Sequence, residues 1–200
     1  MQLEWHRDGY TIGTDPAWLD LGVIHGFLAA SYWATGIPRE VVRRSIEHSI
    51  NFGIYHVPAA AGRGTTSDAG SGGSSVPRPA GRPGDATGNA PTSRAGRPGD
   101  QVGFARVITD RATFGYLGDV FVLEPHRGRG LSRWLLECID RHPELKDFRR
   151  WVLLTRDAHG LYRKFGYAPV QAPERYMERW APDVYAPDSA RLGEGPGSRP

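Results

Sequence analysis

The chain has 200 residues, a single cysteine and a formal net charge of +3. This length is sufficient for one domain with a hydrophobic core, and one cysteine excludes an internal disulfide. A mean hydropathy of −0.47 argues against a membrane span, and the N-terminus lacks the apolar region of a signal peptide, so we expect a cytoplasmic protein without a membrane partner.

The first part of the chain predicts one strand, two helices and a second strand. Residues 10–14 are a short strand candidate, and Asp15 is a favourable N-cap before Pro16. Apolar residues then recur at helical spacing and predict a buried helix face: Trp18, Leu21, Ile24, Phe27 and Leu28. Gly36 ends this unit, a second helix follows, and residues 51–57 predict a strand.

Residues 58–100 differ sharply from the rest of the chain. They are rich in Gly, Pro, Ser, Ala and Arg, they contain no Phe, Leu, Ile, Trp or Tyr, and the hexapeptide AGRPGD occurs in them twice. Such a segment cannot bury enough apolar surface to offset the entropy lost on ordering. We therefore predict a single domain over residues 1–180, interrupted by a disordered insert at 58–100 between two antiparallel strands and followed by a disordered tail at 181–200.

The second half predicts alternating strands and helices. Residues 102–109 and 116–123 are strand candidates joined by a turn, and a helix follows from Gly130 to about His142. Cys138 lies on the apolar stripe of this helix, which favours a core thiol over a nucleophile. The remaining elements are expected at 151–155 (strand), 158–165 (short helix), 167–170 and 176–180 (two final strands).

A glycine-bearing loop between a strand and a helix is the first indication of function. Residues 120–123 form an apolar strand end, Pro125 stops it, and Gly128 and Gly130 let the backbone turn tightly. Free N–H groups at a helix N-terminus bind anions, so this loop predicts a phosphate-bearing ligand at residues 127–132. The loop lacks the Lys-Ser or Lys-Thr of a P-loop and the third glycine of a dinucleotide fold.

Two motifs in order resemble the GNAT superfamily of acetyl-CoA-dependent N-acetyltransferases. The first is Arg-x-x-Gly-x-Ser from Arg127 to Ser132, where the family carries [Q/R]-x-x-G-x-[G/A]. The second is TRDAHGLYRKFGY from Thr155 to Tyr167, where the family commonly shows N-x-x-A-x-x-L-Y-x-x-x-G-[FY]. Serine at 132 and threonine at 155 depart from the family pattern. The resemblance covers about residues 8–57 and 101–180.

The resemblance implies an α/β (α+β) fold with a mixed, mostly antiparallel central sheet, splayed around the cofactor and flanked by four helices. It also implies transfer of an acetyl group from acetyl-CoA to a primary amine by direct transfer in a ternary complex. No grouping of His, Cys, Asp or Glu in the sequence has metal-ligand spacing, so we expect no metal. Tyr162 matches the family's general acid, which protonates the departing sulfur. The implied cofactor-binding residues are Val120, Phe121, Val122, Arg127, Gly128, Arg129, Gly130, Leu131, Ser132 and Thr155.

The general base and the acceptor are less constrained. Asp119 precedes the cofactor strand, and strand alternation puts it on the face opposite Val120 and Val122; it either draws a proton from the amine through water, attracts a cationic acceptor, or makes an ordinary strand-end hydrogen bond. Tyr32, Trp33 and Tyr116 are candidate acceptor contacts. Two histidines are alternatives to Asp119, but we expect His126 to be a surface turn residue and His159 to help cap the short helix. We expect His25 to be structural.

The acceptor is expected to be a small-molecule amine or a peptide, and the protein a monomer or homodimer. The arginines scatter along the chain rather than clustering beside aromatics, so we expect no nucleic-acid partner. A non-catalytic acyl-CoA-binding module on the same fold is the main alternative. An RNA- or partner-binding protein that works through the insert is a third possibility.

Overall fold

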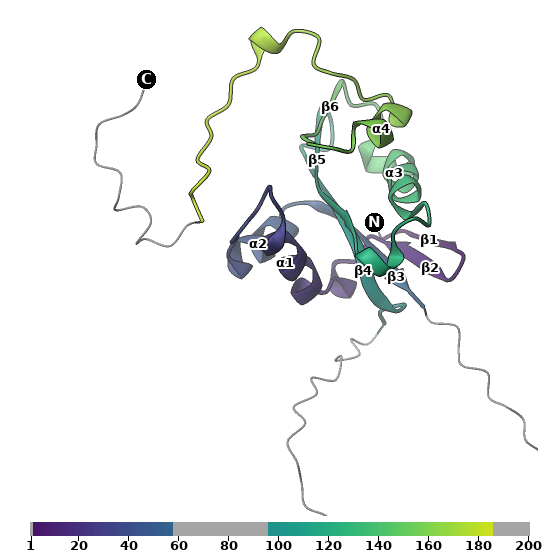
Figure 1. Ribbon diagram of the computed structural model, residues 1–200. Helices are drawn as coiled ribbons and strands as arrows, with labels where there is room; N and C mark the ends of the chain where they lie inside the picture. Colours follow the sequence, from purple (N-terminus) through teal and green to yellow (C-terminus); the bar gives the residue numbers. More distant parts are fainter. Residues whose placement is uncertain (1, 58–95, 186–200) are drawn as a thin grey trace, which may run out of the picture.

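The computed structural model describes residues 2–57 and 96–185, and one sheet organises them (Figure 1). Its six strands follow one another in chain order: β1 (Glu4–Arg7), β2 (Tyr10–Gly13), β3 (Ile50–His56), β4 (Asp100–Thr109), β5 (Phe114–Val122) and β6 (Arg150–Val152). The first five pair antiparallel, and β6 pairs parallel to β5. The mixed, mostly antiparallel sheet is therefore confirmed.

Four α-helices cover the two faces of this sheet (Figure 1). On one face lie α1 (Leu21–Ala30) and α2 (Arg39–Glu47), and on the other lie α3 (Leu131–Arg141) and α4 (His159–Tyr162). Each face has its own apolar core. The α1 side includes Ile24, Leu28, Val42, Phe104 and Phe121, and the α3 side includes Phe52, Ile54, Val107, Leu135 and Ile139.

The strands β5 and β6 separate after a short paired stretch. They pair only where residues 114–116 meet residues 150–152, and β5 then continues to Val122. Close approach at the paired end depends on Gly115, since a Cβ there would lie 2.8 Å from the Trp151 ring. Beyond Tyr116 the inner edge of β5 has no strand beside it among the described residues. This is the predicted splay in the sheet.

Several boundaries differ from the sequence-based expectation. The helix expected from Pro16 is instead a short 3-10 turn (Pro16–Trp18), and α1 begins only at Leu21 because the Asp20 carboxylate accepts hydrogen bonds from the N–H groups of Gly22 and Val23. Strand β1 was not predicted, although Asp8–Gly9 between it and β2 is a typical two-residue hairpin turn with both φ angles positive.

The two final strands expected at 167–170 and 176–180 are wrong, since both segments are described and neither is a strand. Pro169 removes a ladder donor from the first segment, and residues 176–180 are all exposed. The helix expected over 158–165 is divided between α4 and a 3-10 turn (Arg163–Phe165).

The predicted insert does join two antiparallel strands, β3 and β4. Its C-terminal end belongs to the fold, because the Arg97 guanidinium, with a side chain only 8% exposed, pairs with Asp20 at 3.0 Å, and β4 begins at Asp100. Residues 58–95 and 186–200 lie outside the described part of the chain, and so do the predictions of disorder there. Among the described residues no helix is long and apolar enough to cross a membrane.

Candidate active site

The glycine loop between β5 and α3 forms the floor of a small cavity. Gly128 and Gly130 have φ angles of 74° and 72°, a left-handed conformation that favours glycine. Gly130 is the N-cap of α3, and no described side chain caps the first turn, so the first N–H groups of the helix are free for a ligand. The cavity measures about 190 Å³, and its lining includes Val122, Gly128, Gly130, Leu131 and Ser132. The loop has the predicted position and shape.

Two arginines hold this loop against the sheet. The Arg127 Nε donates to the backbone oxygen of Val122 at 2.9 Å, which ties the loop to the end of β5. Arg7 donates to the Gly130 oxygen at 3.4 Å and lies 4.6 Å above the Trp134 ring. Sequence reasoning missed Arg7, because its strand was not predicted and its partners lie more than a hundred residues away.

A β-bulge interrupts β5 in the middle of the splay. Phe104 opposes Phe121 and Arg106 opposes Gly118, so Asp119 and Val120 together oppose the single residue between them on β4. Asp119 has a φ of 56°, a conformation that is uncommon for a non-glycine residue. The sequence analysis inferred the face on which Asp119 lies from simple strand alternation. It did not predict the bulge.

The carboxylate of Asp119 joins three parts of the fold. It pairs with the guanidinium of Arg106 on β4, with both side chains largely buried. It also accepts a hydrogen bond from the Trp33 Nε1 at 3.2 Å, which comes from the loop between α1 and α2. Val122 belongs to the opposite, α3-side core, so Asp119 lies on the face predicted for it. Arg106 is a site residue that the sequence analysis did not identify.

The loop between α1 and α2 also reaches across to the segment after β6. The Tyr32 hydroxyl accepts a hydrogen bond from the backbone N–H of Arg156 at 3.1 Å, and the Arg156 guanidinium lies 3.9 Å above the Tyr32 ring. The rings of Tyr32 and Trp33 pack edge to face at 4.9 Å. These residues line an open groove of about 680 Å³ that continues along α1 to Leu123 at the end of β5.

Tyr162 lies on α4 with only 8% of its surface exposed. Burial raises its pKa to about 12, and the nearby ionisable groups of Tyr32, Asp157 and Tyr116 act in the same direction. Burial, and secondarily the Asp119 carboxylate, also raises the pKa of Tyr116. The predicted catalytic and acceptor residues therefore gather around the splay, and the Tyr162 phenol is protonated at neutral pH.

The other candidates have structural partners. The Thr155 hydroxyl accepts from the Ala158 N–H at 3.1 Å, immediately before α4 begins. His126 bonds through Nδ1 to the Tyr10 hydroxyl at 2.9 Å, and its pKa is lowered by burial first and by His56 second. Cys138 is buried, and burial raises its pKa to about 12, which agrees with a core thiol.

Comparison with known proteins identifies the family. The chain is 32% identical over 167 residues to a Gibberella zeae protein named as an acetyltransferase, covering 80% of this chain and 79% of the relative. Residues 94–169 match the model of the acetyltransferase (GNAT) domain. The chain belongs to the GNAT family of acetyltransferases.

Solved structures agree with this assignment. A GNAT-family protein from Xanthomonas campestris pv. campestris is 37% identical, superposes with a TM-score of 0.68, and matches over 91% of this chain and 100% of its own. A structure from Deinococcus radiodurans resembles this chain in fold, with a TM-score of 0.54 and 14% identity. The match covers 90% of this chain and 96% of that protein. The α/β fold and the family inferred from the two sequence motifs are thus confirmed.

Proposed function

We propose that this chain transfers an acetyl group from acetyl-CoA to a primary amine, directly and within a ternary complex. The observation that carries the proposal is the geometry of the splay. A glycine loop that begins a helix lies at one end of the unpaired inner edge of β5, and a protonated, buried tyrosine with an aromatic and carboxylate cluster lies around the other.

The glycine loop suits the pyrophosphate of coenzyme A. No described atom lies within 4 Å of the position that a Cβ would take on Gly128, so the backbone there is open to a bulky ligand. The first-turn N–H groups of α3 point out of the helix, and their partial positive charge attracts an anion. Arg129, exposed beside them, adds a full charge, while Arg127 fixes the loop to β5.

The inner edge of β5 suits the extended arm that carries the thioester. Beyond the last residue paired with β6, the backbone of residues 120–122 has no neighbouring strand on that side within the described chain. Apart from the Val122 oxygen, which accepts from Arg127, the N–H and C=O groups that face this edge are therefore available to an amide-bearing arm, and an N–H there can stabilise the oxygen of the thioester carbonyl as it gains charge.

The acetyl transfer itself needs one bond to form and one to break. The amine nitrogen attacks the thioester carbonyl carbon, a C–N bond forms, and the C–S bond breaks. Tyr162 donates its hydroxyl hydrogen bond to the departing sulfur. The proton lost by the nitrogen passes to a water molecule, and the Asp119 carboxylate accepts it from that water. Arg106 and Trp33 already bond to this carboxylate, but a carboxylate has about four lone-pair sites.

The test is release of free coenzyme A from acetyl-CoA with a panel of amines, combined with calorimetric titration of acetyl-CoA. Ser132→Glu adds a negative charge at the N-terminus of α3, where it favours the helix but repels a phosphate. We expect unchanged or higher thermal stability and loss of acetyl-CoA binding. Arg141→Gln changes the net charge equally at the other end of the same helix and should bind normally. Normal binding by Ser132→Glu, or no thiol release with any amine, would count against the proposal.

A further inference from the structure

The groove along α1 combines an apolar wall with a single charged side chain. Its volume is about 680 Å³, and one face of α1, the α1–α2 loop and the end of β5 build its wall, with Val23, Phe27, Tyr32, Trp33 and Leu123 as its large side chains. Within the described ranges, Arg156 is the one charged residue that lines it, and no carboxylate does. The groove therefore favours a ligand that carries a negative charge rather than a second positive one.

Aromatic rings give this wall a surface that is open to solvent. Tyr32 and Trp33 are 48% and 43% exposed, and their rings pack edge to face at 4.9 Å. Phe27 stacks on Phe121 of β5 with ring centroids 3.9 Å apart, which joins the wall to the core. Large apolar side chains that are exposed together in a hollow are typical of a binding site. The groove thus suits a ligand with an apolar or aromatic portion.

Tyr32 holds Arg156 in place at two points. The backbone N–H of Arg156 donates to the Tyr32 hydroxyl at 3.1 Å, and the guanidinium lies 3.9 Å from the centre of the Tyr32 ring. The guanidinium also forms a long ion pair with Asp157 at 3.8 Å, and the Arg156 side chain remains 65% exposed. A guanidinium has five N–H donors in a planar fork that matches a carboxylate. Arg156 therefore presents a positioned cation to an anionic group in the groove.

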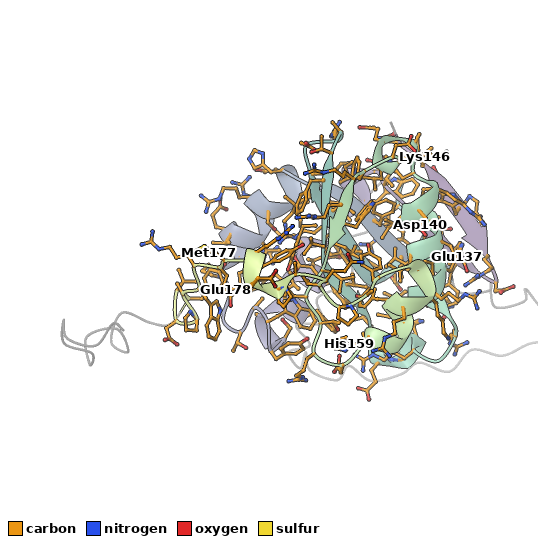
Figure 2. The ribbon with its side chains drawn as sticks, turned by 90° about the horizontal axis from the view of Figure 1, so that it is seen from above. Glu137, Asp140, Lys146, His159, Met177 and Glu178 are labelled. Carbon is orange, nitrogen blue, oxygen red and sulfur yellow. The ribbon has the colours of Figure 1, made fainter. Side chains whose placement is uncertain are left out.

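The groove and the glycine loop lie on opposite sides of the sheet. Figure 2 shows α1 and α2 on one side of the sheet and Glu137 and Asp140 of α3 on the other. The α1–α2 loop also reaches the splay, since the Trp33 Nε1 donates to Asp119 at 3.2 Å. A molecule in the groove can therefore direct an amine toward Asp119 while acetyl-CoA occupies the glycine loop.

We infer that the acceptor is an amino acid with an apolar or aromatic side chain, whose carboxylate pairs with Arg156 while its side chain lies against Tyr32 and Trp33. This inference rests on the proposed function and names its substrate class. A diamine fits less well, because its second ammonium group would lie beside the guanidinium, and like charges repel. The N-terminus of a peptide also fits less well, since it carries an amide where the amino acid has its carboxylate.

The product is then an N-acetyl amino acid. The α-amine nitrogen attacks the thioester carbonyl carbon, a C–N bond forms, and the C–S bond breaks. The nitrogen loses one proton, which passes through water to Asp119, and the sulfur leaves as the coenzyme A thiolate, which accepts a hydrogen bond from Tyr162. Arg156 takes no part in these bond changes, so its contribution is to the choice of acceptor.

The test compares phenylalanine with phenylalaninamide, which keeps the ring and the amine and lacks the negative charge. At equal concentrations of the neutral amine, we expect kcat/KM for release of free coenzyme A to favour phenylalanine by about tenfold, the low end for a charge-assisted hydrogen bond because the guanidinium is exposed. Arg156→Gln keeps the backbone N–H that bonds to Tyr32 and should use the two acceptors equally. Arg156→Glu should prefer the amide. Arg44→Gln, exposed on α2, changes the net charge as Arg156→Gln does and should keep the wild-type preference.

A second variant tests the apolar wall. No described atom lies within 4 Å of the position that a Cβ would take on Gly26 of α1, so Gly26→Leu extends into the groove without a clash at that position. Leucine also has the higher helix propensity. We expect this variant to be at least as stable as the wild type and to bind acetyl-CoA normally, with a KM for phenylalanine raised by about tenfold or more, since the ring loses its place. An unchanged KM would count against the groove.

A binding measurement separates failure of this inference from failure of the proposed function. Phenylalanine is titrated by calorimetry into the protein saturated with coenzyme A, which carries no acetyl group and cannot react. We expect binding by the wild type and a loss of about tenfold in affinity in Arg156→Gln. Thiol release with equal use of phenylalanine and its amide would overturn the inference and leave the proposed function standing, and so would thiol release with no binding of phenylalanine. Binding that depends on Arg156, without thiol release from any amine, would retain the assignment of the groove and overturn the proposed function. Neither binding nor release would overturn both.

Discussion

Replacing Tyr162 by phenylalanine tests the chemical step with little change in packing. The phenol is 8% exposed and its pKa is raised to about 12, whereas a thiol has a pKa of about 8.5. Complete proton transfer from this phenol to a free thiolate would be uphill by about 3.5 pKa units, or about 4.8 kcal/mol. The hydroxyl therefore acts chiefly as a hydrogen-bond donor to the developing thiolate.

A hydrogen bond to a charged group contributes about 1.5–3 kcal/mol, which corresponds to about a 10- to 150-fold effect on rate. We expect kcat of Tyr162→Phe to fall by about that factor, with the KM for acetyl-CoA changed less than about twofold, because the bond is made mainly in the transition state. The assay is continuous detection of released thiol with saturating amine.

Tyr167→Phe is the matched control for this variant. Tyr167 is a neighbouring tyrosine whose ring lies 5.8 Å from that of Tyr162, and burial also raises its pKa. It should retain wild-type turnover. A Tyr162→Phe enzyme with unchanged kcat would refute the reasoning. So would a fall in wild-type activity near pH 10 that disappears in the variant, because a pKa of about 12 keeps the donor protonated there.

Two further predictions concern stability. Asp119→Asn should lower the free energy of unfolding by about 2–4 kcal/mol in urea denaturation, because it leaves the largely buried Arg106 guanidinium without its counter-charge, and a loss below about 0.5 kcal/mol would contradict this. Burial lowers the pKa of His142, so as the pH falls this side chain is protonated in the unfolded chain before it is protonated in the folded protein. The contribution of His142 to the free energy of unfolding is therefore complete above about pH 6.5 and declines below that pH, by at most about 1.4 kcal/mol per pH unit. His142→Gln should reduce this slope when melting is followed between pH 7 and pH 5.

The sequence alone predicted what depends on local residue order. The glycine loop, the helix after it and the buried stripe of α3 are set by residues within one or two turns of each other, and the structure has them where the pattern indicates. The two motifs that identify the GNAT family also lie within such local units. The family was accessible from the sequence for this reason, because the glycine loop is a local structure.

Features that depend on contacts distant in sequence were missed. The pairing of Arg106 with Asp119 rests on the register between β4 and β5, which no residue pattern fixes. Arg7 reaches Gly130 through a hairpin whose Asp8–Gly9 turn was available as a signal and was not used. Strands were expected at 167–170 and 176–180, but a strand needs a neighbour, and neither segment pairs with one among the described residues.

The bulge in β5 allows one strand to build both a core and a site. Leu117 belongs to the α3-side core, and with strict alternation Asp119, two residues later, would point to the same apolar side. The extra residue reverses this direction, so Asp119 instead meets Arg106 and Trp33 on the α1 side. A φ of 56° costs about 1–3 kcal/mol, and the ion pair and hydrogen bond made by the reoriented carboxylate offset that cost. The conformation and the contacts therefore depend on each other, which makes Asp119 as much a determinant of strand direction as a candidate proton acceptor.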